Sequence, residues 1–79
     1  MSQRVYCIAQ FEPKPGKLEE LFRVLQALEP DTLREDGCVQ YRITRHIHSP
    51  FAEGTSFPLV FNEIWANMEV FEAHCQKPY

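Results

Sequence analysis

Residues 59–74, LVFNEIWANMEVFEAH, change from a strand pattern to a helix pattern within one short segment. Side chains alternate in character up to Trp65, which predicts a strand with Glu63 on the same face as the indole. Helical spacing then leads to His74, and Asn67 is suited to cap the first turn of that helix. We therefore expect the indole of Trp65 and the imidazole of His74 to meet at one end of a sheet, where a chemical site would lie.

Length and composition favour a single domain over residues 1–79, with 44% hydrophobic and 13% aromatic residues to form its core. Eight basic and eleven acidic residues give a formal net charge of −3, and no Lys/Arg cluster indicates a nucleic-acid partner. No apolar run is long enough to span a membrane, and the N-terminus does not read as a signal peptide. Cys7, Cys38 and Cys75 lack paired spacing, which favours reduced thiols and a cytoplasmic location.

The rest of the chain supplies two more predicted strands and a helix. Residues 4–12 alternate with apolar side chains on both faces, as in a strand that is covered on both sides. Residues 17–28 form an amphipathic helix that Pro30 should end or kink, and residues 31–35 add one helical turn. Residues 39–47 predict a half-exposed strand, joined to the next by a long loop that we expect to cover a pocket or a neighbouring subunit. The two strands flanking this loop should pair antiparallel.

The resulting order is β-α-β-β-α, an α+β, ferredoxin-like pattern βαββα(β) whose last strand is apparently missing from this chain. Several short pieces, in order, resemble the antibiotic biosynthesis monooxygenase superfamily of dimeric α/β barrels. They are Lys14-x-Gly16-Lys17, Pro30-x-Thr32, Glu35-x-Gly37-Cys38-x-x-Tyr41, Glu63-x-Trp65, His74 and Pro78. The resemblance implies a homodimer in which two sheets join into a barrel, with a small pocket between the sheet and helices of each protomer.

The resemblance also implies a reaction. Many members of the superfamily oxygenate quinols, anthrones or related electron-rich aromatics without a cofactor, using molecular oxygen as the co-substrate. The haem-degrading branch uses an asparagine on the first strand, and Ile8 stands at that place here, so haem degradation is disfavoured. Family members also continue beyond the proline at Pro78 and often have histidine where Tyr79 stands.

His74 is the candidate general base, because a histidine side chain titrates close to neutral pH. Trp65 is a candidate platform for a flat substrate, and Glu63 could orient His74 or pair with an arginine. The alternatives are a histidine that packs on Trp65 at a helix end, a tryptophan that only fills the core, and a solvated glutamate. The residues expected to contact substrate are Asn62, Tyr6, Ile8, Phe22 and Tyr41.

His46-x-His48 places two imidazoles on one strand face, but two donors are too few for most protein metal sites, so we expect no metal. Two other functions stay open at this point. A non-catalytic module could bind a small aromatic molecule. An isomerase of a small phosphorylated signalling metabolite would need basic side chains facing its pocket, and the candidates are Arg42, Arg45, His46 and His48. Fold alone does not choose among these functions.

Overall fold

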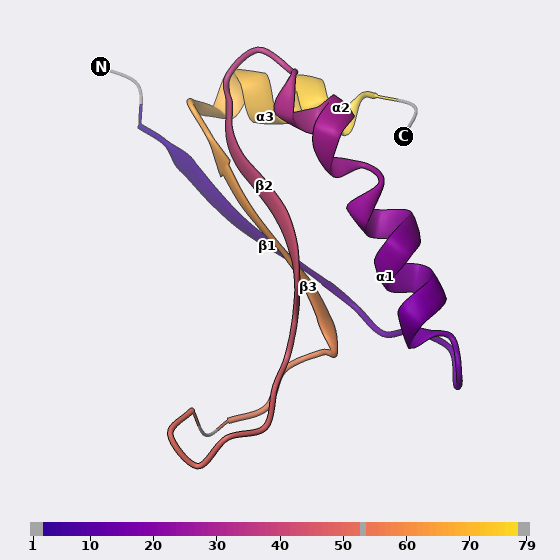
Figure 1. Cartoon of the computed structure of the whole chain (residues 1–79). Coiled ribbons are helices and arrows are strands. Elements are labelled where there is room, and N and C mark those ends of the chain that lie inside the picture. The colour runs from indigo at the N-terminus through magenta and orange to yellow at the C-terminus, as the bar shows by residue number, and fades with distance from the viewer. Residues whose placement is uncertain (1–2, 53, 78–79) are drawn as a thin grey trace.

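The computed structural model describes residues 3–52 and 54–77. Its elements, in order, are β1 (Val5–Phe11), α1 (Leu18–Gln26), α2 (Glu29–Leu33), β2 (Cys38–Arg45), β3 (Leu59–Trp65) and α3 (Met68–Cys75). The three helices lie on one side of a twisted sheet, and the loop between β2 and β3 extends away from them (Figure 1). Pro78 and Tyr79, which entered the family resemblance, lie outside the described residues.

The sheet has the strand order β1-β3-β2, so β3 is the central strand and pairs antiparallel with both neighbours. Val5 of β1 and Cys38 of β2 both lie opposite Trp65, which places the end of β3 between the beginnings of the other two strands. The described part of the chain therefore has three strands of a ferredoxin-like α+β fold, without a fourth. The predicted antiparallel hairpin of β2 and β3 is confirmed.

The core forms on the face of the sheet that the helices cover. Along β3 every second residue is buried, as the alternating pattern predicted, and Leu59 and Trp65 have no exposed surface. Burial of each large apolar side chain contributes about 1.5–3 kcal/mol to folding. The buried apolar residues are Leu25, Tyr41, Ile43, Leu59, Phe61 and Trp65.

Pro30 does not interrupt a helix in the way the sequence suggested. The helix α1 already ends at Gln26, and Pro30 lies in the first turn of α2, which begins at Glu29. A proline is tolerated in a first turn because the backbone N–H it lacks would have no partner within the helix. The extra helical turn therefore starts two residues earlier than the predicted residue 31.

Gly37 joins the start of β2 to the turn between β3 and α3. Its φ of +84° lies in the left-handed region, and its carbonyl accepts a 2.8 Å hydrogen bond from the backbone N–H of Ala66. A Cβ atom at this position would lie 2.7 Å from the nearest methyl carbon of Val70 in α3. The fold thus requires a residue without a side chain here, both for its conformation and for the close approach of α3.

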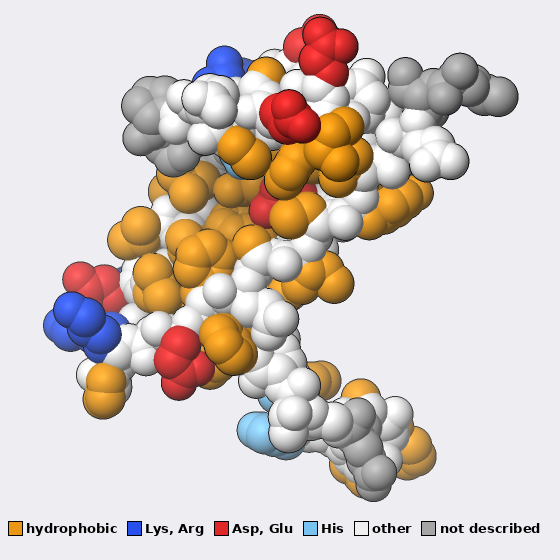
Figure 2. All heavy atoms as spheres, turned by 180° about the vertical axis from the view of Figure 1, so that it is seen from behind, with side chains coloured by type: hydrophobic (Ala, Val, Ile, Leu, Met, Phe, Trp, Pro, Cys, Tyr) orange, Lys and Arg blue, Asp and Glu red, His pale blue; other side chains and the backbone are white. Residues whose placement is uncertain are grey.

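The second face of the sheet is uncovered in the single chain. Tyr6 and Ile8 of β1 point to this face and are 70% and 66% exposed. The prediction that β1 is covered on both sides is therefore wrong for one chain alone, because all three helices lie on the other side. The view from behind looks onto the β1 edge of the sheet, where hydrophobic side chains gather in the middle of the molecule between the strands and the helices (Figure 2).

Two contacts made by carboxylates of the helices attach them to the outer strand β2. Glu29 in α2 accepts a 2.8 Å hydrogen bond from the backbone N–H of Ile43. Arg45 donates to both carboxylate oxygens of Glu19 in α1, at 2.7 and 2.6 Å, and its guanidinium lies 4.3 Å from the centre of the Phe22 ring. These contacts fix α1 and α2 over β2.

Gly37→Ala should destabilise the fold more than Gly16→Ala. Both glycines have positive φ, but a Cβ at Gly16 would meet nothing within 4 Å. We expect Gly16→Ala to lower the free energy of unfolding by about 1–2 kcal/mol through backbone strain alone. Gly37→Ala should lower it by about 2–4 kcal/mol, because overpacking against Val70 adds to the strain. Urea denaturation of both variants measures the difference, and equal losses would contradict the close contact with α3.

Candidate functional site

The candidate site lies where β3 passes into α3. The strand ends at Trp65, and the side-chain Oδ1 of Asn67 accepts a 2.9 Å hydrogen bond from the backbone N–H of Val70. This confirms the predicted N-cap, which satisfies one of the free donors in the first helical turn. His74 follows in the last turn of α3, so strand, cap and helix together set the position of its ring.

Trp65 and His74 are in direct contact. Their ring centroids are 4.5 Å apart and their planes are tilted by 33°. The indole has no exposed surface, and its Nε1–H donates a 3.0 Å hydrogen bond to Oε1 of Glu63. The predicted contact between these two rings is therefore present. The indole packs against the imidazole, however, and offers no open face to a ligand in this chain. Among the described residues, the hydrogen-bond partner of Glu63 is Trp65, where the sequence suggested His74 or an arginine.

His74 pairs with a different carboxylate, which belongs to Glu35. Nδ1 of His74 lies 3.2 Å from each carboxylate oxygen of Glu35, and the two side chains are only 13% and 9% exposed. Glu35 stands between α2 and β2, and in the sequence it is distinguished only as part of the family resemblance. The position of Glu35 two residues before the turn glycine Gly37 was the one sign in the sequence that it could matter. Nothing local links it to His74, because 39 residues separate the two.

Tyr41 completes the cluster from β2. Its ring meets those of His74 and Trp65 at angles of 63° and 69°, with centroid distances of 5.5 and 6.3 Å. Burial, aided by the negative charge of Glu63, raises the pKa of Tyr41 from 10 to about 12. The phenol therefore stays protonated throughout the physiological pH range.

The surroundings of Cys7 and Cys38 do not favour a nucleophilic thiolate. Burial, followed by the charge of Glu63, raises the pKa of the Cys7 thiol. The pKa of Cys38 is raised by burial and then by Glu35. Both thiols are thus held in their less reactive protonated form. Cys7, Cys38 and Cys75 are free thiols in this structure.

The other residues expected to contact a substrate are divided between the two faces of the sheet. Tyr41 and Phe22 lie on the helix-covered side. Tyr6, Ile8 and Asn62 belong to the opposite face, as the register with β3 shows. Asn62 there donates a 3.0 Å hydrogen bond to the hydroxyl of Thr44. One pocket within a single chain cannot include all five residues.

The basic and imidazole side chains in and just after β2 lie away from the cluster. Arg42 and His48 are exposed, and Arg45 is bound by Glu19. The exposure of Arg42 and the pairing of Arg45 count against the isomerase hypothesis, which needs basic side chains in a pocket, but His46 and His48 line an open hollow beside the loop. The rings of His46 and His48 are 5.0 Å apart. Within residues 3–52 and 54–77, no three His, Cys, Asp or Glu side chains gather as metal ligands would.

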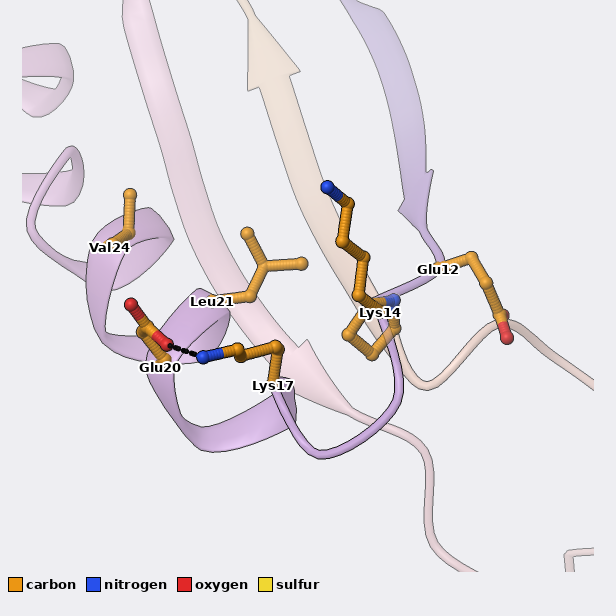
Figure 3. A pocket seen from close by; sticks show the side chains of 7 residues that line it. Glu12, Lys14, Lys17, Glu20, Leu21 and Val24 are labelled. Atoms are coloured by element: carbon orange, nitrogen blue, oxygen red, sulfur yellow. Dashed lines mark ion pairs between the residues drawn. The ribbon is translucent and has the colours of Figure 1, made fainter.

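Three hollows lined by described residues also lie elsewhere. One is an open groove at the turn between β1 and α1, where Leu21 and Val24 form an apolar wall and Lys17 pairs with Glu20 at 3.3 Å (Figure 3). The other two adjoin the loop that contains His48. In the described residues, no helix has the length and apolarity needed to cross a bilayer.

The Tyr41 environment predicts a loss of stability at high pH. Because the folded pKa is near 12 and the ordinary value is 10, the stabilising effect is complete below pH 10 and disappears as the pH rises toward 12. Wild type should therefore lose up to about 2 kcal/mol over this interval relative to Tyr41→Phe. Denaturant titrations at several pH values measure this difference, and parallel curves for the two proteins would contradict it.

Comparison with known proteins supports the fold and gives the family. A family model described as antibiotic biosynthesis monooxygenase matches residues 4–79. The crystal structure of protein SO0527 from Shewanella oneidensis is similar, with 33% sequence identity and a TM-score of 0.79. The match covers 99% of this chain and 70% of that chain. The search of curated proteins found no match. Since the family match spans nearly the whole chain and the folds agree, this protein belongs to the antibiotic biosynthesis monooxygenase family.

Proposed function

We propose that this protein is a cofactor-independent monooxygenase of small electron-rich aromatics, such as quinols or anthrones, and that it acts in the cytoplasm. The observation that carries the proposal is the pairing of His74 with Glu35, beside the indole of Trp65. An imidazole that is held at one nitrogen by a carboxylate is suited to accept a proton at the other nitrogen. The match to the antibiotic biosynthesis monooxygenase model supports oxygenation as the class of reaction.

In the proposed reaction, His74 removes a proton from a phenolic hydroxyl of the substrate. The resulting anion is electron-rich enough to pass an electron to molecular oxygen. One oxygen atom then enters the substrate, and the other leaves as water with the two hydrogens that the substrate loses. The four electrons needed to reduce oxygen all come from the substrate, so the reaction requires no external reductant or redox cofactor.

The surrounding side chains have supporting roles in this proposal. Trp65 keeps the imidazole in place from one side, and Glu63 fixes the indole through its Nε1–H. Tyr41 remains a neutral phenol, which can donate a hydrogen bond to an oxygen of the substrate anion. Phe22 lies on the same side of the sheet and supplies apolar surface. Low exposure of the cluster strengthens its electrostatic interactions relative to those in water.

His74→Ala should abolish most oxygen consumption in the presence of a quinol or anthrone that wild type turns over. Loss of a general base typically lowers kcat by roughly 100-fold or more. His48→Ala is the matched control, because His48 is exposed on the loop side of the molecule and should retain wild-type rates. Oxygen-electrode measurements with a panel of substrates provide the test. Equal activity, or equal inactivity, of wild type and His74→Ala on every substrate would refute the assigned role.

A non-catalytic binding module is the second candidate, and the complete burial of Trp65 favours it. With the indole covered by His74, the cluster has the character of a packed core as much as that of an open site. The same substrate panel separates the two functions. A quinol that raises the melting temperature without oxygen uptake would identify a binding protein.

We further propose that a second copy of the chain covers the open face of the sheet. The large exposed fractions of Tyr6 and Ile8 support this, since apolar side chains gathered on one face commonly mark an interface. Asn62 and Arg42 lie on this face as well, opposite each other in the register, and would take part in the contact. On this assignment, Tyr6, Ile8 and Asn62 contact the second copy and are remote from the substrate of His74.

Light scattering after gel filtration should give twice the chain mass of 9.3 kDa. Ile8→Asp should produce the monomer, because it buries a charge at the proposed contact. Ile47→Asp is the control, since Ile47 is equally apolar and 68% exposed but belongs to the loop side. A monomeric wild type at micromolar concentration would exclude the proposed dimer.

A further inference from the structure

Glu35 is held in place by its backbone as well as by its side chain. Its N–H donates to the carbonyl of Thr32 at 3.0 Å, and its own carbonyl accepts from Cys38 at 3.1 Å. Two residues later, Gly37 is fixed against Val70 and bonded to Ala66. Both sides of the Glu35 position are therefore anchored, so the carboxylate has a defined direction toward α3.

The ring of His74 is also restrained, by the two aromatic rings that contact it. The Trp65 indole lies against it at 4.5 Å, and the Tyr41 ring approaches at 5.5 Å. A rotation of the imidazole by half a turn would replace Nδ1 with a carbon atom opposite Glu35 and lose the hydrogen bond. The packing thus fixes the plane of the ring, and the hydrogen bond selects the flip that places Nδ1 opposite Glu35.

An ionised carboxylate can only accept hydrogen bonds, so the hydrogen between the two groups must belong to Nδ1. A neutral imidazole carries one N–H, and when Nδ1 holds it, Nε2 is left as an acceptor. We propose that Glu35 is the positioning residue of this site: it holds neutral His74 in the Nδ1–H tautomer and thereby makes Nε2 the atom that accepts a proton. The catalytic meaning of this assignment rests on the proposed function, whereas the tautomer itself does not.

The two buried carboxylates of the cluster therefore have separate tasks. Glu63 accepts the indole N–H at 3.0 Å and fixes Trp65. Glu35 accepts from the imidazole at 3.2 Å and fixes the position of its hydrogen. Glu63→Gln is thus a matched control for Glu35→Gln. Both changes remove a buried negative charge from the same cluster, but only one removes the carboxylate that faces Nδ1.

The test uses the full chain labelled with ¹⁵N and long-range ¹H–¹⁵N correlation spectra of the imidazoles, followed through a pH titration to the neutral form. The sequence has three histidines, so comparison with His74→Asn assigns the His74 signals. Wild type should show neutral His74 with the hydrogen on Nδ1, as should Glu63→Gln. Glu35→Gln should give a mixture, because an amide can donate as well as accept. Glu35→Leu should shift His74 to the Nε2–H form that free histidine prefers.

Wild type alone can overturn the inference: a neutral His74 with its hydrogen on Nε2 would do so, whether or not any variant folds. An unchanged tautomer in folded Glu35→Leu, checked by circular dichroism, would also overturn it. These spectra need no substrate, so failure of the oxygen-uptake assay leaves them interpretable. Where a substrate is found, Glu35→Gln should lower kcat with little change in KM, by less than His74→Ala does, and a change confined to KM would contradict the positioning role.

Discussion

The close approach of Gly37 and Val70 is the constraint on which the rest of the structure depends. It lets α3 settle directly over the start of β2, because no side chain stands between them. The same few residues carry the hydrogen bond from Ala66, which joins the turn after β3 to the segment before β2. Glu35 and His74 face each other only because these two parts of the chain meet here.

Pairing at the site follows from what each side chain can donate. The cluster contains two ring N–H groups and two carboxylates, and each carboxylate meets one ring. Hydrogen bonds to an ionised group contribute about 1.5–3 kcal/mol, whereas leaving a buried charge without its partner costs about 3–5 kcal/mol. The aromatic rings of Trp65, His74 and Tyr41 then fill the space around these bonds. Stability and positioning of the imidazole are therefore achieved by the same contacts.

Local patterns in the sequence were sufficient for the secondary structure. The alternation of residues 59–65, the spacing of α1 and the cap at Asn67 each depend on a few neighbouring residues, and the structure contains all three. The contact of Trp65 with His74 was also within reach, because one short segment carries both. The partner of His74 could not be predicted in this way, because Glu35 is 39 residues away in the sequence and tertiary packing brings it to His74.

Other differences have equally physical causes. The alternation of side chains showed that β1 is apolar on both faces, but it could not show that every helix would lie on one side of the sheet. Pro30 was read as a helix breaker, whereas its neighbours made it part of a first turn, in which its missing N–H has no cost. The division of Tyr41 and Asn62 between opposite faces follows from the register of β2 with β3. A shift of β2 by one residue would have placed Tyr41 on the same face as Asn62.

The hydrogen bond from Ile43 to Glu29 has a consequence for how this sheet could aggregate. It occupies a backbone donor of β2 that would otherwise be available to a foreign strand, and α2 lies over the same strand. In the described ranges no strand pairs with the far side of β1. Of the two outer strands, β2 therefore has the better protected edge, and β1 offers the edge at which another chain would add.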